Sequence, residues 1–335
     1  MTPSDSTWAR ISSFGALCRA AHAAARGKQL GRDAQSFLAD LECNALELQR
    51  QLLAGNWAPG TPHTFFIRDP KPRRISAAPF VDRVVHHALC AVVGPVLESS
   101  ASDCSFACRK GRGTHAALGR ARQLAASCDR YHKLDVEHYF ETIDHAVLLA
   151  LLRRHVACDA TMALLERIVQ VGAPGSEPGR GMPIGNLTSQ HFANLVLTEV
   201  DRVASSHPGV RGYVRYMDDM LLFGDSYREL AAAAAAASAV VTLHLNQRIK
   251  LSATRHGRCS DGVPLLGLRL FPGTVRFDHA RARRFMRTAR SLRDALANGA
   301  MPEANCARRV CALLNWSDQA SAAGLARLAF AESSR

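Results

Sequence analysis

Three aspartates have the type and spacing expected of a metal-dependent catalytic site. Asp135 ends an apolar segment, and Asp218 and Asp219 stand together between two apolar runs much later in the chain. Neighbouring carboxylates between hydrophobic strands repel one another and are costly to desolvate, so a compensating charge is needed. Two Mg²⁺ ions would supply it, because this cation prefers carboxylate oxygens and keeps positions for substrate phosphates. Such ions would activate a hydroxyl nucleophile and stabilise a phosphate leaving group.

A solvated turn is the competing explanation of the Asp218-Asp219 pair, because aspartate is common in turns. Taken alone, the pair is better explained in that way, and only the motifs around the aspartates, described below, reverse the balance. Residues 131–136 predict a strand that contains Asp135 near its end, and residues 212–224 predict a hairpin with the two acids at its tip.

The other segments predict a mixture of helices and strands. Before residue 279, helices are expected at 1–58, 80–97, 115–127, 189–205 and 231–243. Gly94-Pro95 is expected to interrupt the second of them. Short strands are expected at 64–67 and 263–271, and loops at 105–114 and 174–185. Either Asn186 or Thr188 is expected to cap the helix near residue 189. From residue 279 onward the chain is expected to be helical and is rich in arginine.

The composition fits a folded protein with a polyanionic partner. The chain has 335 residues, 47% of them hydrophobic, and this length suggests about two domains. The formal net charge of +13 points to nucleic acid or an anionic membrane surface. No membrane insertion and no signal peptide are expected, because the longest uncharged run, 230–247, is Ala-rich rather than strongly apolar. The ten cysteines form no Cys-x-x-Cys pair, which favours free thiols in a reducing cytoplasm.

Two motifs around the aspartates resemble the palm motifs of reverse transcriptases. They are Tyr216-Met217-Asp218-Asp219 and the segment 133–140, Lys-Leu-Asp-Val-Glu-His-Tyr-Phe. A third segment, 181–190, reads Gly-Met-Pro-Ile-Gly-Asn-Leu-Thr-Ser-Gln and resembles the motif that distinguishes the reverse transcriptases of diversity-generating retroelements. Group II intron and retron enzymes usually have Gln-Gly where this chain has Ile184-Gly185, and Ser-Pro where it has Ser189-Gln190. Further matching segments lie in order between about residues 60 and 275, at 70–73, 82–89, 107–115 and 265–267.

The resemblance implies an α+β right-hand polymerase with fingers, a palm made of an antiparallel sheet plus helices, and a helical thumb. The expected boundaries are 1–125 for the N-terminal helices and fingers, 126–149 for the first part of the palm, 150–180 for a fingers insertion, 181–277 for the second part of the palm and 278–335 for the thumb. Within the thumb, six arginines recur partly at helical spacing and would track a duplex backbone: Arg281, Arg283, Arg284, Arg287, Arg290 and Arg293.

The resemblance also implies a role for each site residue. Asp135 and Asp218 would be the shared ligands of two Mg²⁺ ions, which Mn²⁺ can replace. Asp219 would be a weaker ligand, and the carbonyl of Val136 would assist. Phe140 would be a steric gate against the ribose 2′-hydroxyl, with an ordinary core aromatic as the alternative.

Basic and glycine-containing segments would contact the nucleic acid and the nucleotide. The expected dNTP contacts are Lys71 and Arg73, with Arg74 as the adjacent alternative, and Ile184 and Gly185 near the nascent base pair. The expected template and primer contacts are Arg109, Lys110, Arg112, Leu266 and Gly267, of which the last two resemble the primer-grip hairpin of the family. Solvated basic loops and ordinary loop packing are the alternatives, and for each thumb arginine the alternative is a solvated helical face. Arg248 or Lys250 would protonate the leaving pyrophosphate, and the sequence does not choose between them.

The expected activity is RNA-directed DNA polymerisation, error-prone at template adenines, by a cytoplasmic enzyme of bacterial or phage origin. Its partners would be template RNA, the RNA/DNA duplex, dNTPs and a small basic accessory variability protein, expected to be oligomeric. One alternative is a reverse transcriptase of retron, group II intron or defence type. The other is a catalytically idle RNA-binding scaffold, against which the retention of all three aspartates argues.

Overall fold

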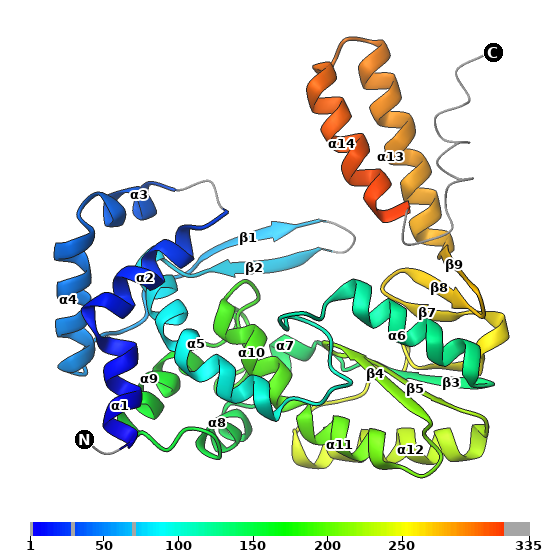
Figure 1. Ribbon diagram of the computed structural model, residues 1–335, viewed down its shortest axis with the longest axis horizontal. Coiled ribbons are helices and arrows are strands. Elements are labelled where there is room, and N and C mark those ends of the chain that lie inside the picture. The colour runs from blue at the N-terminus through cyan, green and yellow to red at the C-terminus, as the bar shows by residue number, and fades with distance from the viewer. Residues whose placement is uncertain (1–2, 28–30, 69–71, 318–335) are drawn as a thin grey trace. The chain divides into compact units, whose positions relative to one another are not determined.

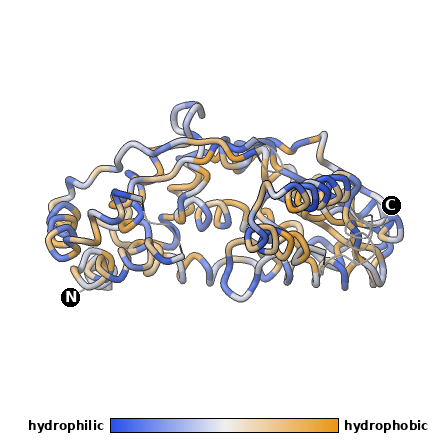
Figure 2. Tube along the Cα trace, turned by 90° about the horizontal axis from the view of Figure 1, so that it is seen from above, coloured by the Kyte–Doolittle hydropathy of each residue, from blue (hydrophilic) through white to orange (hydrophobic). Residues whose placement is uncertain are grey.

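The computed structural model describes residues 3–27, 31–68 and 72–317. The chain forms two compact units, each built from three separate stretches of sequence. Unit 1 comprises residues 1–108, 136–202 and 237–250, and unit 2 comprises 109–135, 203–236 and 251–335. Helices combine with antiparallel sheets (Figure 1), which confirms the prediction of a mixed α+β fold. Hydrophobic and hydrophilic residues are interspersed along the helices (Figure 2), as expected for helices that bury one face.

The N-terminal part of unit 1 is helical, as predicted, and is followed by a two-stranded sheet. Its elements are α1 (Pro3–Ser12), α2 (Phe14–Ala25), α3 (Arg32–Ala39), α4 (Leu41–Leu53), β1 (His63–Ile67), β2 (Arg73–Ala77) and α5 (Phe80–Ser100). Strands β1 and β2 pair antiparallel, with Phe65 opposite Ile75. The core of the unit lies where α2 and α10 (Leu187–Val196) pack on α5, around buried side chains such as Leu17, Leu89 and Phe192.

Helix α5 runs without a break through Gly94-Pro95, where the sequence predicts an interruption. Pro95 lacks the N–H of one helical hydrogen bond, but buried residues on both sides, including Val93 and Leu97, anchor the helix in the core. Gly94 allows the ring of His191 to approach closely, since a Cβ there would lie 3.3 Å from it. The helix is long and apolar enough to cross a membrane by length and composition. In this structure about half of its apolar stretch is buried against neighbouring helices, as in a core helix.

The rest of unit 1 is helical. The helices are α7 (Tyr139–Thr142), α8 (His145–Arg153), α9 (Asp159–Gln170), α10, and α11 (Thr198–Ser206), whose last residues belong to unit 2. The single helix predicted over 189–205 is therefore two helices, because the backbone leaves helical geometry at Leu197. Asn186 occupies the N-cap position of α10, although its side chain makes no capping hydrogen bond.

Unit 2 contains a four-stranded antiparallel sheet in the order β4-β5-β3-β6. The strands are β3 (Arg130–Leu134), β4 (Gly212–Tyr216), β5 (Asp219–Gly224) and β6 (Arg255–Arg258). Strand β5 is buried from Met220 to Gly224, as its uninterrupted apolar sequence requires. Helix α6 (Thr114–Ser127) packs against the sheet, and Gly212 leaves room for the side chain of Leu124.

In the second sheet of unit 2, the strand-like segment 263–271 is divided into two strands at Leu266-Gly267, where the resemblance implies a hairpin. Strands β7 (Val263–Leu265) and β8 (Leu268–Phe271) pair antiparallel around a two-residue turn, and β9 (Thr274–Phe277) completes the sheet. Leu266 and Gly267 both have positive φ, 51° and 75°, as the favoured two-residue hairpin turns require. The remaining elements are α12 (Tyr227–Ala239), a π-helical turn at Val240–His244, a 3₁₀ turn at Cys259–Asp261, α13 (His279–Ala297) and α14 (Glu303–Ser317).

Candidate active site

The hairpin β4–β5 presents the two adjacent aspartates. Tyr216 pairs with Asp219 across a two-residue turn, so Asp218 lies in the turn and Asp219 begins β5. Met217 has a φ of 55°, which non-glycine residues adopt rarely and mainly in turns. Arg215 is fully buried, and its Nη1 donates to the carbonyl oxygen of Met217 at 3.2 Å. A buried arginine thus supports the turn that carries Asp218.

Strand register brings the third aspartate to the same end of the sheet. Leu134 of β3 pairs with Met220 of β5, and one step further along this register Asp135 stands opposite Asp219. The electrostatics agree with that placement. Burial raises the pKa of Asp219 above its ordinary value, the charge of Lys133 opposes the rise, and the charge of Asp135 adds to it.

Lys133 holds Asp219 from the neighbouring strand. Its Nζ lies 2.8 Å from Oδ2 of Asp219 and 3.4 Å from the carbonyl oxygen of Pro264 in β7. Only 14% of the Lys133 side chain and 16% of the Asp219 side chain are exposed. Sequence reasoning assigned no role to Lys133. The signal was present, because residues two apart in a strand share a face and Lys133 precedes Asp135 by two.

The oxygen donors of this site suit a hard divalent cation. Oδ1 of Asp219 is buried and has no hydrogen-bond partner, and such an orphaned acceptor is the kind of atom that a cation would satisfy. Within the described ranges, no three His, Cys, Asp or Glu side chains are already grouped so as to hold a metal ion. Val136, the backbone candidate, belongs to unit 1, where it forms an isolated bridge with Ile249.

The basic loop predicted to contact template lies beside the aspartate hairpin within unit 2. Arg109 and Arg112 are half-buried and Lys110 is exposed. The loop ends where Thr114 begins α6, and Oγ1 of Thr114 lies 3.1 Å from the hydroxyl of Tyr216. This contact ties the loop to the residue two positions before Asp218.

The predicted primer contacts, Leu266 and Gly267, form the β7–β8 turn. The carbonyl oxygen of Leu266 accepts from Nη1 of Arg281 at 2.6 Å, and that of Gly267 accepts from the amide of Asp278 at 3.2 Å. The turn is therefore fixed to the start of α13. Arginines 283, 287 and 290 are exposed on that helix at spacings that place them on one face.

The residues predicted to contact dNTP belong to unit 1, and backbone hydrogen bonds connect most of them. The amide of Met182 donates to the carbonyl oxygen of Phe140 at 2.7 Å, and the amide of Ser76 donates to that of Ile184 at 2.9 Å. The loop 181–185 is thereby joined to α7 on one side and to β2, which carries Arg73, on the other. Arg73 is exposed.

Gly185 makes the contact with β2 possible. Its φ is 121°, and a Cβ there would lie 3.0 Å from Cγ2 of Ile75 and 3.2 Å from the carbonyl oxygen of Ser76. Ile184 is half-buried. Arg74, the alternative to Arg73, is also half-buried, and its guanidinium lies against Gly175. Lys71 lies outside the described residues.

Helix α7 positions the predicted steric gate. His138 has a φ of 46° and turns the chain into the helix. The hydroxyl of Tyr139 donates to the carbonyl oxygen of Ala193, and the ring of Phe140 packs edge-on against Tyr139 with centroids 5.5 Å apart. Phe140 is half-buried.

The segment that carries the two candidate general acids lies beside the start of α7. The carbonyl oxygen of Arg248 accepts from the amide of Glu137 at 2.8 Å. The Arg248 side chain is exposed and that of Lys250 is half-buried.

Comparison with known proteins identifies the family. Residues 68–270, more than half of the chain, match the family described as reverse transcriptase (RNA-dependent DNA polymerase). The chain belongs to this family. The reverse transcriptase is therefore an RNA-directed DNA polymerase, with template RNA and nucleotides as substrates. The match contains the three aspartates and every predicted dNTP, template and primer residue.

Two curated proteins are similar to this reverse transcriptase. Protein YkfC of Escherichia coli is 23% identical over 284 residues, which cover 71% of this chain and 74% of YkfC. The COX1/OXI3 intron 1 protein of Saccharomyces cerevisiae is 23% identical over 141 residues, which cover 39% of this chain and 17% of the yeast protein.

Proposed function

We propose that this reverse transcriptase belongs to a diversity-generating retroelement and copies its template RNA into cDNA with errors at adenines. The supporting observation is the segment 181–190, where Ile184-Gly185 and Ser189-Gln190 replace the Gln-Gly and Ser-Pro of group II intron and retron enzymes. The carbonyl oxygen of Ile184 accepts from the amide of Ser76 in β2, which fixes the backbone that carries the Ile184 side chain. An apolar residue there would check base pairing less strictly than glutamine.

In the proposed right-hand arrangement, the sheet β4-β5-β3-β6 is the palm and α13 with α14 is the thumb. Strands β1 and β2 with the surrounding helices of unit 1 contribute to the fingers. The boundaries expected from sequence, at 125, 149, 180 and 277, stay predictions. The location is proposed to be the cytoplasm of a bacterium or the host of a phage.

The proposed chemistry is transfer of a deoxynucleotidyl group to a primer 3′-hydroxyl. Asp135 and Asp218, assisted by Asp219, would hold two Mg²⁺ ions, which supply activation of the hydroxyl and neutralisation of the phosphate charge. Lys133 keeps Asp219 in place and offsets part of its charge. Arg73 would bind the triphosphate, and the Phe140 ring would exclude a ribose 2′-hydroxyl.

Primer extension on an RNA template tests the catalytic assignment. With Mg²⁺, we expect extension by the wild type and none by Asp218→Ala. The matched control is Asp225→Ala, since Asp225 follows the same strand but pairs at the surface with Arg211 at 2.6 Å. Equal extension by the two variants would overturn the assignment. RNA binding without extension by any of the three proteins would favour the idle scaffold.

Sequencing of the cDNA tests the retroelement assignment. Ile184→Gln should lower misincorporation opposite template adenine, and an unchanged error rate would count against the role of Ile184. Stimulation by a small basic accessory protein encoded nearby, and a template and variable repeat pair in the same genome, are expected.

The intron-type alternative is favoured by one observation, the similarity to the yeast COX1/OXI3 intron 1 protein. An intron around the coding sequence, with no repeat pair and accurate copying of adenines, would support that alternative.

A further inference from the structure

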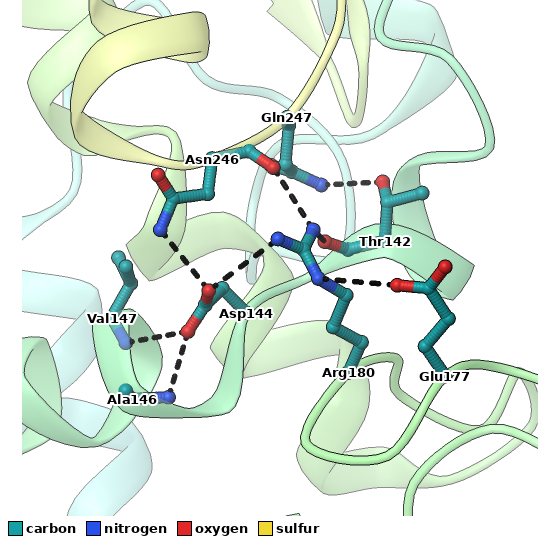
Figure 3. Close-up of polar contacts among 8 residues, drawn as sticks. All are labelled: Thr142, Asp144, Ala146, Val147, Glu177, Arg180, Asn246 and Gln247. Atoms are coloured by element: carbon teal, nitrogen blue, oxygen red, sulfur yellow. Dashed lines mark hydrogen bonds and ion pairs between the residues drawn. The ribbon is translucent and has the colours of Figure 1, made fainter.

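A polar cluster in unit 1 joins three segments that are far apart in the sequence (Figure 3). The cluster has Arg180 at its centre. Nη1 of Arg180 donates to the carbonyl oxygen of Asn246 at 3.0 Å and to that of Thr142 at 3.4 Å. The guanidinium also lies 3.7 Å from Oδ2 of Asp144 and 3.9 Å from Oε2 of Glu177. With 31% of its side chain exposed, Arg180 is more a packed residue than a solvated surface charge.

Asp144 is shared between Arg180 and the start of α8. Oδ1 accepts from the amides of Ala146 and Val147, which caps the helix, and Oδ2 accepts from Nδ2 of Asn246 at 3.1 Å. Burial alone would raise the pKa of Asp144. Hydrogen bonds from Val147, Asn246 and Ala146, with the charge of Arg180, outweigh burial and lower that pKa below its ordinary value. The carboxylate is therefore charged at neutral pH.

Gln247 continues the cluster toward α7. Its Nε2 donates to Oγ1 of Thr142 at 2.9 Å and to the carbonyl oxygen of Tyr139 at 3.0 Å. Only 2% of Gln247 is exposed. Buried hydrogen bonds thus hold residues 246–247 on α7. Arg180 lies in the loop that follows α9, and its bonds to Asn246 and Thr142 attach that loop to both segments.

The loop that follows Arg180 begins at Gly181 and contains Ile184. Gly181 has a φ of 86°, and its amide donates to the carbonyl oxygen of Ile143 at 2.8 Å. A glycine at positive φ is conformationally permissive, so its neighbours must fix the direction of the chain. Arg180 and Asp144 form an isolated antiparallel bridge, and the bonds of Gly181 and Met182 to residues 143 and 140 continue it.

We propose that Arg180 is a positioning residue, which together with Asp144 and Asn246 holds the loop 181–185 against α7 and so determines how tightly the incoming nucleotide is bound. The inference rests on the proposed nucleotide-contacting role of Phe140, Ile184 and Gly185. Arg180 contacts no reacting atom in this scheme. It acts through the hydrogen bond between Met182 and Phe140.

The geometry requires arginine at this position. The separate nitrogens of one planar guanidinium reach two carbonyl oxygens and two carboxylates, a wider set of acceptors than the compact ammonium group of lysine can contact at once. Arg180→Lys should therefore restore little of what Arg180→Met loses.

The test compares Arg180→Met with Arg153→Met. Arg153 belongs to the same unit and pairs with Asp159 at 2.7 Å, but their side chains are 51% and 91% exposed. Steady-state primer extension should show a ~10-fold rise in the KM for dNTP in Arg180→Met with little change in kcat, because a displaced loop weakens binding more than chemistry. Arg153→Met should match the wild type. An unchanged KM, or a fall in kcat alone, would overturn the inference.

A second measurement does not depend on activity. Hydrogen exchange at the amides of Gly181 and Met182 should become faster in Arg180→Met and stay at the wild-type rate in Arg153→Met. Equal exchange in the two variants would overturn the inference even if the wild type polymerises normally. If the wild type shows no extension at all, the proposed function fails, and the exchange result still decides whether Arg180 positions the loop.

Discussion

Lys133 and Asp219 form a largely buried ion pair between neighbouring strands, with Nζ 2.8 Å from Oδ2. The two residues are diagonal neighbours in the β3–β5 register, in which Lys133 pairs with Leu221, and a long side chain can span that diagonal. The same ammonium lies 3.4 Å from the carbonyl oxygen of Pro264. One lysine thus connects the hairpin of Asp218 and Asp219, β3 and the hairpin that carries Leu266 and Gly267.

Replacing Lys133 should destabilise the protein, because the buried Asp219 carboxylate would lose its opposite charge. Lys133→Met leaves Asp219 beside Asp135 without its compensating charge, and we expect a loss of about 2–4 kcal/mol in unfolding free energy. Mg²⁺ should recover part of the loss, since a bound cation replaces the missing charge. Thermal unfolding with and without Mg²⁺ measures both effects.

The control for Lys133 is Arg211→Met in the same unit. Arg211 pairs with Asp225 at 2.6 Å, but the side chains are 54% and 46% exposed, and such pairs contribute at most about 1 kcal/mol. Equal losses in Lys133→Met and Arg211→Met, or no response of Lys133→Met to Mg²⁺, would contradict the role of Lys133 at a metal site.

Asp82 should make the protein less stable as the pH rises. Only 4% of Asp82 is exposed, and its Oδ2 accepts from the amide of Gly60 at 2.8 Å. Burial raises the pKa of the Asp82 carboxyl to about 6. Because the folded state keeps the proton to higher pH than the unfolded state, stability is lost as the pH rises from about 4 to about 6. Asp82→Asn should therefore be more stable than the wild type at pH 7.5 by about 2–3 kcal/mol. Urea unfolding at pH 4 and pH 7.5 tests this, and a difference that does not change with pH would refute it.

Asp144 should show the opposite pH dependence. Its pKa is lowered in the folded state, so its contribution is present above the unfolded pKa and disappears as the pH falls through the folded value. Asp144→Asn keeps a residue that caps helices well, and should cost about 1 kcal/mol at pH 7 through loss of charge. In strongly acidic solution the variant and the wild type should converge. A cost that persists there would indicate a defect in packing rather than in charge.

Gly185 should resist substitution more than a glycine with open space around it. In Gly185→Ala the new Cβ would press on Ile75 and Ser76, whereas Gly179 has a φ of 74° with nothing within 4 Å of its Cβ position. Gly179→Ala should cost about 1 kcal/mol from backbone strain alone. Gly185→Ala should cost about 1–2 kcal/mol more and should raise the KM for dNTP. Denaturant unfolding compares the two, and equal costs would show that β2 moves aside freely.

The sequence predicted the hairpin of Asp218 and Asp219 well because local signals agree there. Two apolar runs flank Met217-Asp218, so only a tight turn satisfies the pattern. Local patterns were less successful where packing overrides them. The helix α5 continues through Pro95 because its flanks are anchored in the core, and the strand predicted over 263–271 folds back at Leu266, a residue with no turn preference.

The polar contacts of the site could not be predicted from local patterns. Lys133 meets Asp219 only through the β3–β5 register, and Arg180 meets Asn246 only once the fold of unit 1 brings residues 66 positions apart together. The two-residue spacing of Lys133 and Asp135 indicates that both side chains lie on one face of their strand, but it does not indicate that Asp219 lies beside them. Nothing near Arg180 in the sequence distinguishes it from a solvated loop arginine.

The edge strand β6 affects whether two copies of the sheet β4-β5-β3-β6 can pair. Strand β6 lies at one end of the order β4-β5-β3-β6 and is only four residues long, with Arg255, His256 and Arg258 exposed. A short cationic rim of this kind discourages a second copy from adding its own strand, because like charges would meet as the backbones approached. This edge of the sheet is therefore protected against pairing with the same edge of a second copy when the enzyme gathers on an anionic template.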